Sequence, residues 1–152
     1  AAFERAKKIA PRPMRLIVAG PKQWPLRGAI PEHVEFVGDE PFLALREHMR
    51  NADVMVMPSR FEAFGIVFIE SLAAGTPVIG RRNFAMPEMI THGHNGMLLE
   101  SDDVESLASM IVSVIESDSI AQTCFDEAHA VASYYSWDRV ADDITSVIRD
   151  SR

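Results

Sequence analysis

The sequence has little that supports cross-linking, export or membrane insertion. Cys124 is the single cysteine in 152 residues, so neither an internal disulfide nor a cysteine-based metal cluster is possible. The N-terminal segment AAFERAKKIA is charged and amphipathic and does not resemble a signal peptide. No apolar run approaches the roughly 20 residues of a membrane span. We therefore expect a cytoplasmic protein.

Positive charge is also scarce. The formal net charge is −7, whereas nucleic-acid binders usually carry a basic face, so no nucleic-acid partner is expected. Hydrophobic residues make up 47% and charged residues 24%, which is typical of a folded globular domain. We find no repeat or linker and predict a single domain over residues 1–152. Because residue 1 is not Met, we expect a piece of a longer protein.

Short apolar runs alternate with segments of helical periodicity along the chain. Strands are predicted at 14–19, 34–37, 54–57, 78–79 and 97–99, and helices at 1–10, 41–49, 66–74, 87–90, 104–115, 119–133 and from 136 onward. Most of the strands are continuous apolar runs, which is typical of parallel sheets covered on both faces. The predicted fold is α/β, a Rossmann-like three-layer parallel sheet with C-terminal helices.

The segment 58–80, PSRFEAFGIVFIESLAAGTPVIG, carries the clearest local signals. Gly65 precedes a helical piece, and Gly75 and Pro77 follow it as stop signals. The segment therefore places a helix N-terminus after a buried strand, where α/β sheets bind ligands. The backbone N–H groups of residues 65–67 (Gly65, Ile66 and Val67) are unpaired at such a start and predict an anion site, as for a phosphate.

Two carboxylates, Glu62 and Glu70, flank this helix start with seven residues between them. An ionised carboxylate only accepts hydrogen bonds, so Glu70 suits a vicinal diol such as a ribose. Glu62 suits hydroxyls on the other side of the phosphates. Each glutamate alone is also explained by the helix dipole or by solvation. Their combination around a phosphate site favours a nucleotide sugar.

Other polar residues give weaker signals. Arg60 is as well explained by a solvated surface position as by a diphosphate, and a surface position is favoured for Arg81 and Arg82. Lys22 is a weak candidate at a strand end. No metal site is expected, because no set of ligands with metal spacing occurs; the histidines are interpreted as structural or surface residues: His33, His48, His92, His94 and His129.

Two of the three C-terminal helices carry their own signals. Asp102 with Glu105 three residues later predicts a capping box. Ser136 is expected to cap the final helix, and Trp137 to anchor that helix in the core.

The central segment resembles a known signature. Glu62-Ala63-Phe64-Gly65 followed by Glu70 is similar to the E-x7-E motif of retaining GT-B glycosyltransferases, in particular the large family 4. Further pieces match in the same order and spacing, from about Met14 to the C-terminus: Ala52-Asp53-Val54 with Pro58-Ser59, the segment 70–79, Pro87-Glu88 with 93–99, and Ser136-Trp137.

The resemblance implies the donor-binding, C-terminal half of such an enzyme. Glu70 would hold the donor's ribose, and Glu62 would be the catalytic contact to the transferred sugar. The amides of residues 65–67 would bind the diphosphate, with Phe64 and Arg60 beside them, and Val37-Gly38 would lie against the base. The donor would be a UDP- or GDP-linked sugar, transferred with retention and without a cofactor or a dedicated metal.

The chain also departs from this pattern. The family's opening strand, its Gly-Arg…Lys-Gly segment and its acceptor domain are absent, so we expect the missing N-terminal domain as a partner and an inactive fragment. Membrane contact, at the inner face, would come only through that domain. Gly20-Pro21-Lys22 lacks a second glycine, and Phe84-Ala85-Met86 replaces a Gly-Gly pair.

Two other functions stay open: a non-catalytic Rossmann-like nucleotide-binding module, and a sugar-nucleotide epimerase domain. The epimerase would need a different acidic and histidine constellation, which we do not find.

Overall fold

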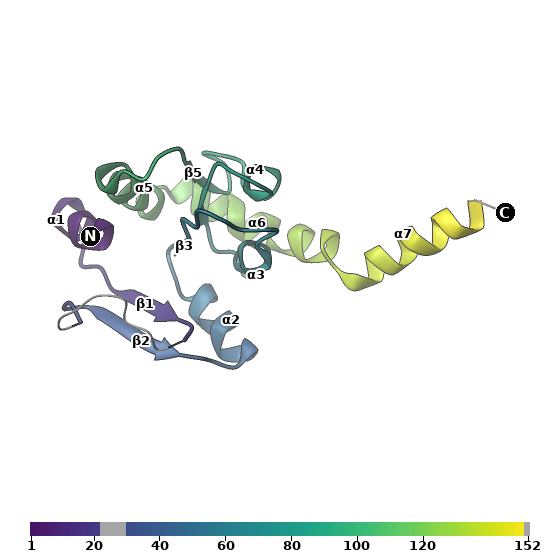
Figure 1. Ribbon diagram of the computed structural model, residues 1–152, viewed down its shortest axis with the longest axis horizontal. Coiled ribbons are helices and arrows are strands. Elements are labelled where there is room, and N and C mark those ends of the chain that lie inside the picture. The colour runs from purple at the N-terminus through teal and green to yellow at the C-terminus, as the bar shows by residue number, and fades with distance from the viewer. Residues whose placement is uncertain (22–29, 151–152) are drawn as a thin grey trace.

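The computed structural model describes residues 1–21 and 30–150 (Figure 1). Within them the predicted alternation of strands and helices is confirmed, with bounds that shift by a few residues. The strands are β1 (Leu16–Ala19), β2 (Val34–Gly38), β3 (Met55–Val56), β4 (Val78–Arg81) and β5 (Gly96–Leu99). The helices are α1 (Ala2–Ile9), α2 (Phe42–Arg50), α3 (Ile66–Ala73), α4 (Met86–Met89), α5 (Val104–Ile115), α6 (Asp118–Tyr134) and α7 (Trp137–Asp150). The weak candidate Lys22 lies outside the described residues.

All strand pairs in the described residues are parallel, as predicted. They form two sheets, however: β1 pairs with β2, and β3, β4 and β5 pair in that order. The apolar strands are expected above to be covered on both faces, which is wrong for β1. Its residues Leu16 to Val18 are half-buried and Ala19 is exposed, because the core gathers around the other sheet. The α/β class stands, and the larger sheet carries the site described below.

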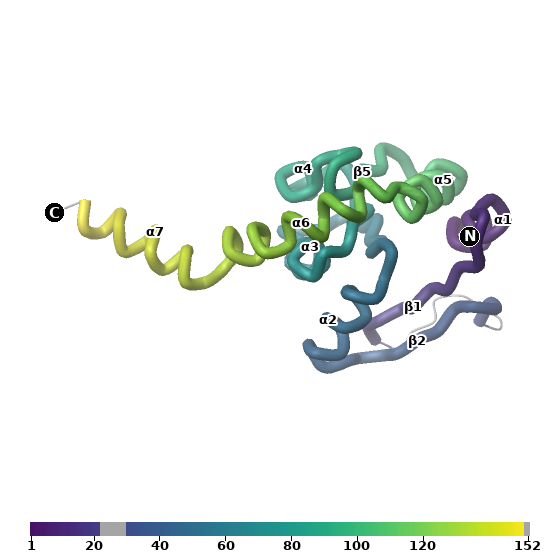
Figure 2. The backbone as a smooth tube through the Cα atoms, turned by 180° about the vertical axis from the view of Figure 1, so that it is seen from behind, coloured from purple at the N-terminus to yellow at the C-terminus, as the bar shows by residue number. Residues whose placement is uncertain are grey.

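The core lies around β4, whose Val78 and Ile79 are fully buried. Phe68 of α3 is fully buried against the same strand, near Gly80. α6 packs along α3, and α1 packs along α5 (Figure 2). This packing fixes α3 directly after β3, and with it the position of the helix start.

Cys124 of α6 is buried in this core. Its thiol donates a hydrogen bond to the backbone oxygen of Asn95, at 3.3 Å. Burial, and then the charge of Glu127, raise the pKa of the Cys124 thiol to about 11. The thiol is therefore neutral at physiological pH.

Two expectations about the C-terminal helices are wrong. The N-cap of α5 is Asp103, which accepts from the Ser106 backbone N–H at 2.7 Å, so the predicted box at Asp102 is displaced by one residue. Trp137 is 85% exposed, because α7 extends away from the body and buries no residue (Figure 1). The Ser136 cap is confirmed, since its hydroxyl accepts from the Arg139 N–H at 3.2 Å. Among the described helices, none is long and apolar enough to cross a membrane.

Candidate functional site

The N-cap residue of α3 is a glycine, Gly65. Gly65 has φ of 81°, and a Cβ there would lie 2.7 Å from Cδ2 of Phe68 and 2.9 Å from Cε of Met86. Both the left-handed conformation and the close packing therefore require glycine. The Phe68 N–H bonds to the Gly65 oxygen at 2.9 Å. Among the described residues, the N–H groups of Gly65, Ile66 and Val67 have no acceptor, and no side chain caps the helix.

The two predicted carboxylates lie on either side of this helix start in the chain. Glu62 is half-buried in the loop between β3 and α3. Glu70, also half-buried, lies one turn into α3 and lines a cavity of about 500 Å³ between α2, α3 and α6. Phe42 and Leu45 of α2 line the same cavity, whereas Glu62 does not. The two carboxylates therefore have different surroundings, with Glu70 facing α2.

Val37 and Gly38 end β2, in the smaller sheet. Gly38 is buried with φ of 80°, and its oxygen accepts from the Gly20 N–H at 2.8 Å. α2 begins four residues later and contributes to the cavity beside Glu70. The structure thus connects the predicted base-contacting segment to Glu70 through α2, although the two belong to different sheets.

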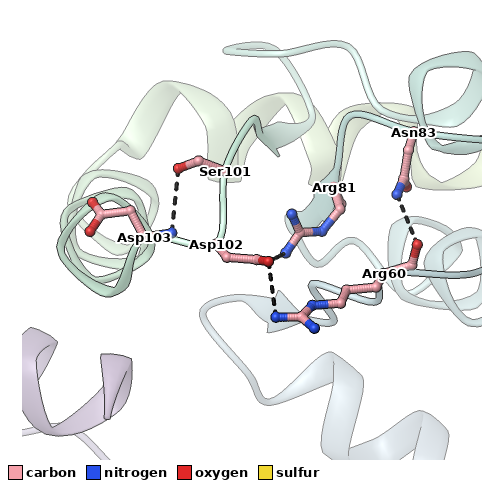
Figure 3. A network of polar contacts seen from close by, with 6 residues as sticks. All are labelled: Arg60, Arg81, Asn83, Ser101, Asp102 and Asp103. Atoms are coloured by element: carbon pink, nitrogen blue, oxygen red, sulfur yellow. Dashed lines mark hydrogen bonds and ion pairs between the residues drawn. The ribbon is translucent and has the colours of Figure 1, made fainter.

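A polar network joins three strand ends (Figure 3). Arg60 follows β3, and its Nη2 lies 2.9 Å from Oδ2 of Asp102, which follows β5. Arg81, the last residue of β4, donates from its own Nη2 to Oδ1 of Asp102. The Arg81 hydrogen bond, and then the nearby Arg60 charge, hold the pKa of the Asp102 carboxyl below its usual value. The carboxylate is therefore charged at neutral pH.

This network corrects the prediction for Arg81. Its side chain is 15% exposed, whereas a solvated surface position was predicted. Burial requires a partner for the guanidinium, and Asp102 supplies it. Asp102 was missed as a site residue because its partners are distant in the sequence. Arg82 is exposed as predicted and pairs with Glu100.

Aromatic side chains flank the same loop. Phe64 is 47% exposed, just before Gly65. Phe61 and Phe84 make an edge contact, with ring centroids 5.0 Å apart. Phe84 has φ of 47°, so it adopts a conformation that bulky residues rarely take. The Asn83 amide donates to the Arg60 oxygen at 3.1 Å and ties the two loops together.

These residues lie at the carboxyl ends of three parallel strands, beside a helix start with open amides. Residues 1–117 match the family model of glycosyl transferases group 1. The chain belongs to this family. The match runs from α1 to the end of α5, whereas α6, which contributes Cys124 to the core, lies beyond it.

Relatives of this group 1 chain include two named glycosyltransferases. The chain is 30% identical over 154 residues to the D-inositol 3-phosphate glycosyltransferase of Jonesia denitrificans, with 93% of this chain and 36% of that protein covered. It is 31% identical over 121 residues to the phosphatidyl-myo-inositol mannosyltransferase of Mycobacterium leprae, with 79% and 32% covered. The chain thus spans about a third of the length of these relatives.

Solved structures share the fold. Anabaena HepE, in complex with UDP-glucose, superposes with a TM-score of 0.79 at 20% identity, covering 98% of this chain and 44% of that one. Sucrose-phosphate synthase from Thermosynechococcus elongatus gives a TM-score of 0.69 at 28% identity, covering 78% and 30%. The fold of this group 1 chain is therefore that of the C-terminal domain of GT-B glycosyltransferases.

No cluster of three or more histidine, cysteine or acidic side chains suited to a metal ion occurs within the described ranges. The expectation that neither metal nor cofactor is used stays a prediction.

Proposed function

We propose that this chain is the donor-binding domain of a retaining, family 4 glycosyltransferase that moves a hexose from a nucleotide diphosphate. The observation that carries the proposal is the start of α3. Three backbone N–H groups there have no acceptor among the described residues, and they lie at the carboxyl edge of a parallel sheet. Helix dipole and open amides together attract phosphate. The solved HepE structure, whose fold this chain shares, holds UDP-glucose.

The diphosphate would bind to the amides of Gly65, Ile66 and Val67, beside Phe64. Arg60 would add a positive charge from the loop that leads to them. A preorganised set of donors stabilises the charge that develops on the leaving diphosphate as the glycosidic bond to the nucleotide breaks. The glycine at residue 65 supplies the left-handed conformation from which these N–H groups begin the helix.

Glu70 would accept hydrogen bonds from the ribose, with the base placed near Val37 and Gly38. This role is supported by the cavity of about 500 Å³ that Glu70 lines together with α2. Glu62 would face the transferred sugar, where its carboxylate favours positive charge at the anomeric carbon. The two roles agree with the different surroundings of the two side chains.

The expected partner is a second domain of the same protein, which would bring the acceptor. Its presence is supported by the chain's short span, 36% and 32% of the two enzymes above. The two separate sheets point, in addition, to a further segment of this same domain. β1 and β3 each pair with a single strand among the described residues, and Arg12, before β1, reaches Asp53, before β3, at 3.0 Å. One further parallel strand between them would join both sheets into the single sheet that the sequence predicts.

Nucleotide binding tests the proposal directly. We expect UDP or GDP to shift the backbone amide resonances of residues 65–70 in NMR titrations of this chain. Glu70→Ala should weaken binding by about tenfold, because the ribose loses a charged acceptor. Glu116→Ala, which removes an exposed glutamate at the end of α5, serves as the matched control. Shifts spread evenly over the chain, or equal losses in the two variants, would contradict the site.

Catalysis needs the longer protein. In that enzyme Glu62→Gln should lower kcat by at least about tenfold with little change in nucleotide affinity, since the interaction is made mainly in the transition state. An unchanged turnover would remove Glu62 from its role and favour a binding module.

A further inference from the structure

Arg60, Arg81 and Asp102 bring three charges to one edge of the β3–β4–β5 sheet. They come from the loop after β3, the end of β4 and the loop after β5, so all three lie where parallel strands end (Figure 3). Arg60 precedes Gly65 by five residues, and its backbone is held by Asn83. The network is therefore adjacent in the chain to the open amides of α3.

The two arginines are held unequally. The Arg81 side chain is 15% exposed, and its Nε is buried without a hydrogen-bond partner in the described ranges. Leaving Arg81 without its carboxylate would strand a mostly buried charge, so this pair is costly to separate. The Arg60 side chain is 80% exposed and Asp102 is 53% exposed. Exposed ion pairs contribute little, so Arg60 is free to exchange one anionic partner for another.

We propose that Asp102 is an internal competitor for the phosphate of the donor. Without nucleotide, the Asp102 carboxylate pairs with the guanidinium of Arg60. When the nucleotide binds, a phosphate replaces Asp102 as the partner of Arg60, while Asp102 stays paired with Arg81. Carboxylate and phosphate oxygens are both good acceptors for a guanidinium, which makes the exchange chemically matched. This inference rests on the proposed function, and it adds that Asp102 weakens nucleotide affinity and so eases release of the nucleoside diphosphate product.

The test is a double-mutant cycle on nucleotide binding, with UDP and uridine as probes and calorimetry as the measurement. Asp102→Asn keeps the size of the side chain and one acceptor for Arg81. It should raise UDP affinity about two- to fivefold, the range expected for an exposed charge pair. Arg60→Gln should lower UDP affinity, and the double variant should match Arg60→Gln alone. Uridine, which lacks phosphate, should bind equally to all four proteins.

Glu100→Gln is the matched control, because Glu100 is another exposed acid on the same loop and pairs with Arg82 instead. If Glu100→Gln raises UDP affinity as much as Asp102→Asn does, the effect comes from the overall charge of the domain, and the inference is overturned. Weaker UDP binding in Asp102→Asn would show that Asp102 positions Arg60 and does not compete. The inference is also overturned if the double variant binds UDP more tightly than Arg60→Gln alone.

A failure of the proposed function gives a different result. If the unmodified chain binds neither UDP nor uridine, the donor site is wrong, and inorganic pyrophosphate becomes the probe. The Arg60 side-chain Nε resonance should then still shift on addition of pyrophosphate, and more strongly in Asp102→Asn. If the Arg60 Nε resonance does not move, the exchange itself is overturned. The unmodified chain alone gives this result, so the test remains decisive where Asp102→Asn does not fold.

Discussion

α3 and α7 both carry apolar side chains that the sequence predicts to be buried, but only those of α3 are buried in the structure. α3 buries Phe68, Ile69 and Leu72 between β4 and α6. α7 buries no residue, and most of its large apolar side chains are exposed over half or more of their surface, with Trp137 at 85% and Ile144 at 56%. The comparison shows that an apolar stripe predicts that a helix packs, but not against what.

The two helices differ in what surrounds them. α3 is apolar on nearly every side and packs against β4, α2 and α6. α7 has one apolar stripe opposite an acidic face, and no described element covers the stripe. The stability of α3 is therefore tied to the core, while that of α7 depends on its own caps and side-chain pairs. The following predictions test this contrast.

Phe68→Ala should have the largest effect. The ring is fully buried, and its loss leaves a cavity in the centre of the core. We expect a decrease of about 3–5 kcal/mol in the free energy of unfolding. Urea denaturation followed by circular dichroism measures it. A loss below about 1 kcal/mol would mean that α3 is not part of the core.

Gly65→Ala should destabilise the domain by about 2–4 kcal/mol, since the new methyl group meets Phe68 and Met86 and the residue keeps a positive φ. Gly93→Ala is the matched control: its φ is 80°, but nothing lies within 4 Å of the added Cβ. The control should lose only about 1 kcal/mol, the strain alone. Equal losses in denaturation experiments would show that close packing at the start of α3 contributes nothing.

Ser136→Ala should act on α7 alone. The hydroxyl caps the first turn through the Arg139 N–H, so its removal should destabilise α7 by about 1 kcal/mol. Backbone amides of α7 should exchange faster with deuterium, while those of α3 keep their rates. A matching acceleration in α3 would show that the two helices unfold as one unit.

Trp137→Ser should have the smallest effect on stability, within about 0.5 kcal/mol, because the ring is exposed. Any self-association of the chain at high concentration should decrease, since exposed apolar stripes are sticky. Sedimentation velocity measures this association. A loss of stability comparable to that of Phe68→Ala would mean that α7 packs on the body.

The sequence predicted the site's frame because its signals are local. Gly65, Gly75 and Pro77 mark the ends of α3, and each depends only on neighbours in the chain. The roles of Arg81 and Asp102 depend on contacts between residues some twenty positions apart, which no local pattern encodes. The prediction that Trp137 is buried fails for a related reason. The apolar stripe of α7 is present, but no described element covers it. The cap at Asp103 instead of Asp102 shows that two adjacent aspartates offer equivalent local signals.

The buried thiol of Cys124 has a practical consequence. With a pKa of about 11 and a hydrogen bond to Asn95, it presents only a trace of thiolate at neutral pH, and thiolate is the form that reacts. Maleimide dyes and thiol-reactive spin labels should therefore not react with Cys124 in the folded chain. A cysteine introduced on α7 or on the loop before α3 would take up such probes selectively, so movements of either helix are open to spectroscopy without first removing the native residue.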